Sequence, residues 1–255
     1  MNRKGSLLFA SALAFAATAS LTGTAAAQDS RYQSWLAVNY QGPVALGGRL
    51  QLVGDAQYRA WDDFTPQAII VRNSLYYRLM DGMFIGVGYM WQPAWNKAEL
   101  VDFVDEHRIF ETFQYTYTHA DTGMQLQLRT RLEQRLRHPQ SDVEFGLRAR
   151  QLVRVLMPFA LSRRLSVVAW DEVFINLTNS GHESAGVNAM GAQTFTPQWE
   201  YAGLDQNRAF LGLAFQAVPS LLRVELGYMN QYVHRVDKAD IVGHTTLLQL
   251  FFNWR

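Results

Sequence analysis

Polar and apolar residues alternate with a period of two along most of this chain. In residues 125–137 every second position holds an arginine, a glutamine or a glutamate, and four leucines, Thr130 and Gln134 stand between them. Successive side chains of a β-strand point to opposite faces of the sheet, so this pattern predicts a strand with one polar and one apolar face. No comparably long stretch carries the period of an amphipathic helix.

The same alternation recurs often enough to predict an all-β chain. It is found in residues 49–60, 70–79, 83–92, 106–118, 125–137, 143–156, 164–176, 206–217, 222–233 and 244–254. A tilted membrane strand needs roughly 9 to 11 residues, whereas strands of soluble sheets average about 5 to 6. The length of these segments and their alternation together favour an antiparallel transmembrane β-barrel.

The number of strands depends on how the first segment is interpreted. Residues 31–40 are also strand-like, which brings the count to eleven. Because bacterial single-chain barrels have even numbers of strands, either this segment is not part of the wall or a further strand lies elsewhere. Residues 177–204 are the best place for a further strand. We therefore predict 10 to 12 strands and favour 12.

Turn lengths and aromatic residues orient the predicted barrel. Short turns belong on the periplasmic side and long loops outside, and aromatic rings gather at the two membrane interfaces. The short turns are residues 81–82, 120–123 and 218–220, and the longer connections are residues 93–105, 177–204 and 234–243. The expected girdle residues are Trp61, Phe64, Trp91, Trp95, Trp199, Tyr201, Tyr228, Tyr232, Phe252 and Trp254.

The first 27 residues have the pattern of a secretory signal peptide. Arg3 and Lys4 precede an uncharged apolar stretch at residues 7–21, and Ala25, Ala26 and Ala27 supply the small residues of a cleavage site. The apolar stretch is short for a transmembrane anchor, which needs about 20 residues. We therefore expect residues 1–27 to be removed and residues 28–255 to form a barrel in the outer membrane of a Gram-negative cell. Its expected partners are outer-membrane lipid and, during biogenesis, the barrel-assembly machinery.

Composition removes some function classes and adds one clue. The chain has no cysteine, so it offers neither a disulfide nor thiol chemistry. The expected mature chain carries 21 basic and 22 acidic residues, a balance that gives no reason to expect nucleic-acid binding. Only Lys97 and Lys238 are lysines in it, and the other 19 basic residues are arginines, whose planar guanidinium suits crowded ion-pair networks.

Six short patterns stand together in a particular order. They are Glu106-His-Arg108, Arg131-Leu-Glu-Gln-Arg135, Arg148-Ala-Arg150, Asp171-Glu-Val-Phe-Ile-Asn176, Asp205-Gln-Asn-Arg208 followed by Gly212, and Glu225-Leu-Gly-Tyr-Met-Asn-Gln231. This series resembles a family of exported proteobacterial proteins known as domain of unknown function number twenty-four ninety, and it covers most of the mature chain. The resemblance implies an outer-membrane barrel and brings no activity. The C-terminal strand also resembles a barrel-assembly signal, although Arg255 follows its last aromatic residue.

The polar faces of the predicted strands carry far more arginines than acids. The arginines assigned inward are Arg49, Arg59, Arg72, Arg78, Arg108, Arg129, Arg131, Arg135, Arg137, Arg148, Arg150, Arg154, Arg164, Arg208 and Arg223, and the acids are Asp55, Glu106, Glu133, Glu144, Glu172 and Glu225. Acid–arginine pairs could simply rigidify the wall. The nine remaining arginines call for water or anions inside, since an unpaired buried charge costs several kcal/mol.

The leading hypothesis is therefore a narrow channel or binding barrel for anionic or polar solutes. The candidate solute-binding residues are Arg108, Arg129, Arg131, Glu133, Arg135, Arg148, Arg150, Arg154, Glu172, Arg208, Arg223 and Glu225. No catalytic residue, metal site or cofactor is assigned.

Two alternatives stay open. An outer-membrane lipid-modifying enzyme could use groups such as His107 and Glu111, which share a strand face, although neither a G-x-S-x-G elbow nor an H-E-x-x-H motif is present. A structural or adhesive barrel could use residues 177–204 as its binding surface or fold them inward as a plug.

Overall fold

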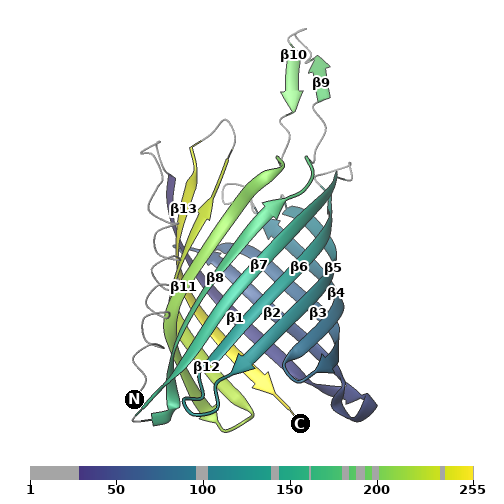
Figure 1. Ribbon diagram of the computed structural model, residues 1–255. Helices are drawn as coiled ribbons and strands as arrows, with labels where there is room; N and C mark the ends of the chain where they lie inside the picture. Colours follow the sequence, from purple (N-terminus) through teal and green to yellow (C-terminus); the bar gives the residue numbers. More distant parts are fainter. Residues whose placement is uncertain are drawn as a thin grey trace.

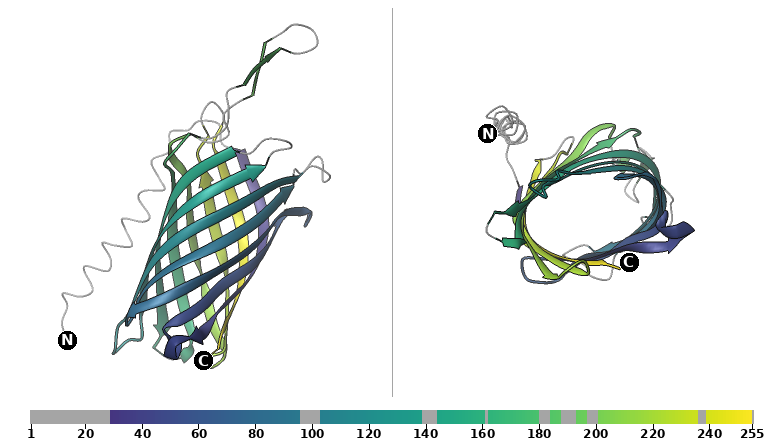
Figure 2. Two further views of the ribbon diagram at one scale, coloured as in Figure 1. Left: turned by 90° about the vertical axis from the view of Figure 1, so that its right-hand side faces the viewer. Right: turned by 60° about the horizontal axis from the view of Figure 1, so that its bottom comes forward.

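A computed structural model of the chain describes residues 29–95, 103–138, 144–160, 162–179, 184–187, 193–196, 201–235 and 239–254. Eleven strands in these residues form one closed barrel (Figures 1 and 2). The expected signal peptide, residues 1–27, lies outside the described residues, as does Trp199. Among the described residues, no helix is long and apolar enough to cross a membrane.

The barrel strands follow the alternating segments of the sequence closely. They are β1 (Asp29–Ala45), β2 (Leu50–Trp61), β3 (Pro66–Met80), β4 (Met83–Trp95), β5 (Phe103–Thr118), β6 (Gln125–His138), β7 (Glu144–Phe159), β8 (Ser162–Asn176), β11 (Gly203–Val218), β12 (Leu222–Val233) and β13 (Ile241–Asn253). A short 3-10 helix, η1 (Leu46–Gly48), joins β1 to β2. All ten predicted strands and the segment at residues 31–40 are thus strands of the wall.

The favoured count of twelve strands is wrong, and the structure shows how eleven close. Every neighbouring pair in the barrel is antiparallel except β1 and β13, which run parallel from the pairing of Asp29 with Ile241 to that of Gln41 with Asn253. In a barrel with an odd number of strands, the first and last strands point in the same direction, so they pair as a parallel ladder. The count of eleven lies within the predicted range of 10 to 12.

The region expected to hold a further strand contains a separate hairpin instead. β9 (Ser184–Val187) and β10 (Gln193–Thr196) pair only with each other. The hairpin stands beyond one end of the barrel, between the ends of β8 and β11 (Figure 1). Its strands are neither part of the wall nor a plug inside it.

Short turns gather at the opposite end, where the C-terminus lies (Figure 1). One of them joins β3 to β4 through Asp81 and Gly82, and Gly82 has a φ of 77°. A side chain there would be strained, and its Cβ would lie 2.2 Å from the carbonyl oxygen of Thr116. Glycine therefore makes this turn possible.

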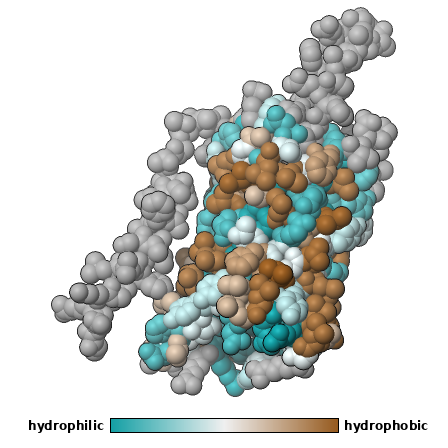
Figure 3. Space-filling view, turned by 45° about the vertical axis from the view of Figure 1, so that its right-hand side comes forward, coloured by the Kyte–Doolittle hydropathy of each residue, from teal (hydrophilic) through white to brown (hydrophobic). Residues whose placement is uncertain are grey.

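The outer wall is largely apolar. Leucine, isoleucine, valine and aromatic side chains on alternate positions of the strands are exposed, among them Leu75, Val87, Ile109, Phe113 and Leu213. Apolar side chains cover much of the face seen in Figure 3, with polar side chains between them. Not every expected girdle residue lies outside, because Trp61 and Trp95 line the interior.

Part of the interior is filled by apolar side chains. One buried cluster joins Trp35, Leu156, Val168, Phe210, Ala214, Met229 and Leu247, and a smaller one joins Ile70, Met90 and Phe110. Gly88 makes room for the second cluster, since a Cβ on it would lie 2.3 Å from the ring of Phe110. The barrel is therefore partly packed, and the space that remains is bounded mainly by polar groups.

Candidate functional site

A cavity of about 1150 Å³ lies inside the barrel, and all eleven strands contribute side chains to its wall. It is somewhat larger than the roughly 300–1,000 Å³ of most small-molecule pockets. Its wall includes Thr118 and Asp81 near the short turns and Trp95 and Gln206 toward the other end. The cavity therefore reaches along much of the barrel.

Twelve arginines line this cavity: Arg59, Arg72, Arg108, Arg129, Arg131, Arg135, Arg137, Arg148, Arg150, Arg154, Arg208 and Arg223. All twelve belong to the fifteen assigned inward from the sequence. Of the other three, Arg49 and Arg164 are exposed and Arg78 is half-buried, and none of them is part of the cavity wall. The strand alternation thus placed most arginines correctly, and it failed near strand ends.

The twelve candidate solute-binding residues fall into two groups. The nine arginines and Glu172 line the cavity. Glu133 and Glu225 are fully buried, with 1% and 0% of their surface exposed, and lie behind the arginines. These two carboxylates are counter-charges of the wall, not groups that a solute would meet.

Glu133 on β6 is the centre of the largest ion-pair network. Its Oε1 accepts from Arg150 Nη1 at 2.6 Å, and its Oε2 accepts from Arg148 Nη2 at 2.7 Å and from Arg108 Nη1 at 3.3 Å. The three arginines come from β5 and β7, the two strands that flank β6. One carboxylate thus holds three guanidinium groups in fixed positions.

The network extends in both directions from Glu133. On β5, Glu106 accepts from Arg108 Nε at 2.6 Å and from Arg135 Nε at 2.5 Å. On β8, Glu172 accepts from Arg150 Nη2 at 2.9 Å and from Arg129 Nη2 at 3.1 Å. The network therefore covers the adjacent strands β5 to β8, which form one side of the barrel.

Asp205 is an interior acid that the strand alternation did not reveal. Its Oδ2 lies 3.3 Å from Arg148 Nη1. The register between β11 and β8 shifts between Leu204 and Gln206, so that both Asp205 and Gln206 reach the cavity. A β-bulge of this kind breaks the alternation on which the assignment rested.

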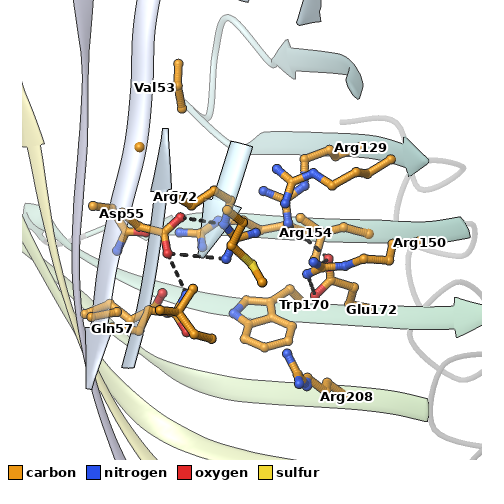
Figure 4. A pocket seen from close by; sticks show the side chains of 18 of the residues that line it. Val53, Asp55, Gln57, Arg72, Arg129, Arg150, Arg154, Trp170, Glu172 and Arg208 are labelled. Carbon is orange, nitrogen blue, oxygen red and sulfur yellow. Dashed lines mark hydrogen bonds and ion pairs between the residues drawn. The ribbon is translucent and has the colours of Figure 1, made fainter. Parts of the chain in front are cut away.

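Two smaller sets of pairs complete the wall. Asp55 on β2 pairs with Arg72 on β3 at 3.1 Å. Glu225 on β12 accepts from Arg223 Nε at 2.8 Å and also pairs with Arg154, which reaches it from β7. In the close view, the Asp55–Arg72 pair faces the Arg150–Glu172 pair across the interior, with Trp170 and Arg208 beside them (Figure 4).

Three cavity arginines have no carboxylate within ion-pair distance among the described residues: Arg59, Arg131 and Arg208. Aromatic rings hold them instead, with Arg131 4.2 Å from the centre of the Phe110 ring and Arg59 3.7 Å from that of Trp35. Arg131 also donates to Thr112 Oγ1 at 3.2 Å, while its buried Nη1 has no partner. These cations are positioned but not neutralised.

The surplus of positive charge is smaller than the sequence indicated. Seven acids line the cavity or lie buried behind its wall: Asp55, Asp81, Glu106, Glu133, Glu172, Asp205 and Glu225. Set against twelve arginines, they leave a surplus of five positive charges among the described residues, whereas the sequence indicated nine. Ion pairing accounts for most of the arginines, and the remainder defines the candidate site.

The groups considered for an enzyme lie elsewhere. His107 and Glu111 are on the outer wall, where His107 contacts Asp105 and Tyr89, and Glu111 accepts a hydrogen bond from Gln134 at 3.0 Å. The two do not form a pair in the structure. A different contact on the outer wall brings together Ser30, His244 and Tyr228.

Comparison with known proteins gives a family but no activity. The model of a family described as proteins of unknown function, DUF2490, matches residues 32–241. An uncharacterised protein of Methylorubrum extorquens is 27% identical over 256 residues, which is 100% of both chains. No solved structure matches the chain. Because the family model covers most of the chain and spans β2 to β12 entire, the protein belongs to the DUF2490 family.

Proposed function

We propose that this protein is an outer-membrane β-barrel, exported through a cleaved signal peptide, whose interior takes up anionic solutes as a narrow channel or binding barrel. The observation that carries the proposal is a cavity of about 1150 Å³ lined by twelve arginines, three of which have no carboxylate partner among the described residues. Charges of one sign around a water-filled passage favour ions of the other sign.

The outer wall supports the membrane location. Its exposed side chains are mostly large and apolar, and strands of 12 to 17 residues are long enough to cross a bilayer. A soluble protein rarely exposes an apolar surface that encircles it. Outer-membrane lipid would then contact this wall, and the barrel-assembly machinery would insert it.

The rigidity of the charged side supports a role in binding or passage. Glu106, Glu133 and Glu172 each hold at least two arginines, so five of the twelve cavity guanidinium groups are fixed by these three acids before any solute arrives. A site whose charges are already oriented loses less entropy on binding. The uncompensated arginines supply the net attraction for an anion.

Planar bilayer recordings test the proposal. In a potassium chloride gradient, the reversal potential should have the sign of an anion-selective pore, and Arg131→Gln should reduce that selectivity. The control is Arg164→Gln, which removes an exposed arginine outside the cavity wall. A folded barrel without conductance would contradict the channel, and a cation-selective one would contradict anion uptake altogether.

A second candidate, an outer-membrane enzyme that modifies lipids, is favoured by one set of contacts on the outer wall. Ser30 Oγ lies 3.1 Å from His244 Nε2, and the Tyr228 hydroxyl lies 2.6 Å from Nδ1 of the same ring. A serine beside an oriented histidine is the arrangement of a nucleophile and its base. A fluorophosphonate probe should then label the native barrel and not Ser30→Ala, and an unlabelled native barrel would contradict the enzyme.

A further inference from the structure

One part of the cavity wall is rich in glutamines and arginines, and one of these glutamines, Gln57, donates through Nε2 to Asp55 Oδ2 at 2.8 Å. It is formed by strands β1, β2, β11 and β12, of which β11 adjoins β8 at the edge of the Glu133 network. We call it the amide–arginine face, and it consists of Gln33, Trp35, Gln57, Arg59, Gln206, Arg208 and Gln231.

These side chains contact one another in a chain. Trp35 Nε1 donates to Gln33 Oε1 at 3.0 Å, and Arg59 Nη2 donates to Gln57 Oε1 at 3.0 Å. With its amide oriented so that the oxygen faces its donors, Gln206 accepts from Arg208 Nη2 at 2.8 Å and from Gln231 Nε2 at 3.0 Å. Each amide therefore has a fixed orientation in the wall.

Trp35 brings the two arginines of this face together. The guanidinium carbon of Arg59 lies 3.7 Å from the centre of the Trp35 ring, and that of Arg208 lies 5.1 Å from it. The two guanidinium groups therefore cannot be farther apart than these two distances combined. Both contact the π-electrons of this ring, and Arg208 also lies 4.7 Å from the centre of the Phe174 ring. The N–H groups that do not donate to Gln57 or Gln206 remain as hydrogen-bond donors.

No carboxylate of the described residues lies within ion-pair distance of either arginine. Glu172 is the cross-strand neighbour of Arg208, but its oxygens accept from Arg150 and Arg129 instead. The Nε of Arg59 is buried and has no hydrogen-bond partner. A buried donor of this kind costs free energy unless a ligand or water accepts from it.

We infer that the amide–arginine face binds a hydroxylated carboxylate, that is, a sugar acid or a similar hydroxy acid. Two adjacent guanidinium groups match the two oxygens of a carboxylate, because arginine donates in a planar fork. Side-chain amides offer both donors and acceptors, which is what hydroxyl groups require. The inference rests on the proposed uptake of anions and names the class of anion.

Calorimetry on the complete mature barrel in detergent micelles tests this specificity without any substitution. D-glucuronate carries both features, D-glucose lacks the carboxylate, and cyclohexanecarboxylate lacks the hydroxyls. Glucuronate should bind at least tenfold more tightly than either control. Equal affinity for glucuronate and cyclohexanecarboxylate would overturn the inference, because the amides would then contribute nothing.

Variants locate the site within the cavity. Arg59→Gln and Arg208→Gln should each weaken glucuronate binding at least tenfold, and the exposed control Arg164→Gln should leave it unchanged. Gln57→Leu should weaken glucuronate binding and leave the affinity for cyclohexanecarboxylate as it is. Both variants should remain folded, which is checked by their resistance to unfolding in unheated detergent. If these folded Arg59→Gln and Arg208→Gln barrels bind glucuronate as tightly as the native barrel, the assignment to this face is overturned.

The bilayer experiment separates this inference from the proposed function. Anion-selective conductance without preferential glucuronate binding would overturn the amide–arginine site and leave the anion channel standing. Glucuronate binding that is lost in Arg59→Gln, in a barrel that does not conduct, would support the site and overturn the channel.

Discussion

At the scale of single residues, Glu133 is the side chain on which the charged wall depends most. It accepts from Arg108, Arg148 and Arg150, and only 1% of its surface is exposed. Glu133→Gln would leave three buried guanidinium groups around a neutral amide. Removing one partner of a buried ion pair costs roughly 3–5 kcal/mol. We expect a loss of that size in the free energy of unfolding, measured by urea titration in lipid vesicles.

The matched control for this substitution is Glu111→Gln. Glu111 also lies on a neighbouring strand, but it is exposed on the outer wall and accepts one hydrogen bond from Gln134. Its replacement by the amide should change the free energy of unfolding by less than about 1 kcal/mol. Equal losses for the two variants would mean that Glu133 does not organise the arginines.

The amide–arginine face shows at the same scale what the charge pattern left out. Gln33, Gln57 and Gln231 occupy inward positions of their strands, yet a search for charge passes over them because they are neutral. Trp35 lies in the strand-like segment of residues 31–40, and the alternation pattern gives it no role beyond that strand. Its contacts with Arg59 of the next strand, β2, and with Arg208 of β11, which is distant in sequence, depend on how the strands are arranged, and alternation along one strand does not show this.

At the scale of elements, the outer face of β5 carries an acid where a lipid-facing strand should be apolar. Glu111 lies between the exposed Ile109 and Phe113 on that face. If this wall contacts lipid, Glu111→Leu should raise the free energy of unfolding by about 1–2 kcal/mol, since it removes a polar group from the apolar band. Urea unfolding in vesicles measures the change.

The reverse substitution on the same strand provides the comparison for Glu111→Leu. Ile109→Glu places a carboxylate two residues away on the same face and should lower stability by a similar amount. A barrel that is destabilised by Glu111→Leu would show that this part of the outer wall contacts something other than lipid.

The connection between β12 and β13 is organised by Asp240. Its carboxylate accepts from the Tyr232 hydroxyl at 2.5 Å and from the Arg235 amide at 2.9 Å, and it lies 3.1 Å from Nδ1 of His234. Burial alone would raise the pKa of Asp240, but the hydrogen bonds from Tyr232 and Arg235 and the nearby His234 lower it below its ordinary value. The charged form of Asp240 therefore stabilises this connection.

Acidification should release the connection in a defined pH window. Because the pKa of Asp240 is lower in the folded protein, its contribution is fully present above the ordinary aspartate pKa of about 3.9 and is lost as the pH falls through the lower native value. Hydrogen exchange at the Arg235 amide, corrected for intrinsic rate, should stay protected at about pH 4 and lose protection below it. Asp240→Asn should abolish the pH dependence, and loss of protection above pH 4 would contradict the role of Asp240.

The strands themselves could be predicted from the sequence, because alternation is a local property of each segment. Residues 222–233 were placed without error, and most other boundaries moved by one to five residues. The predictions of strand number and of inward-facing side chains fail where the alternation is interrupted or does not determine the structure. A bulge carries Asp205 into the cavity, strand ends leave Arg49 and Arg164 exposed, and the β9–β10 hairpin replaces a further strand.

At the scale of the whole molecule, the number of strands decides where the chain enters and leaves the barrel. Because the number is odd, the start of β1 and the end of β13 lie at opposite ends of the barrel. β1 runs from Asp29, at the end that carries the β9–β10 hairpin, to Ala45 at the end with the short turns, and β13 ends beside it (Figure 1). An even-numbered barrel would place both chain ends on one side. The count of eleven strands, where the rule for bacterial barrels favours twelve, therefore determines at which end of the barrel the start of β1 lies.

Single cysteines can test this arrangement directly, because the chain has none of its own. Ser30→Cys reports on the start of β1, Asp63→Cys on the β2–β3 connection at the same end, and Asp121→Cys on the β5–β6 turn at the other end. If short turns face the periplasm, a membrane-impermeant maleimide added to intact cells should label the first two sites and not the third. Permeabilising the outer membrane should then expose Asp121→Cys. The opposite result would be that Ser30→Cys behaves like Asp121→Cys and is labelled only after permeabilisation, while Asp63→Cys is labelled in intact cells. That result would show that β1 does not pair in parallel with β13 and that the barrel closes in another way.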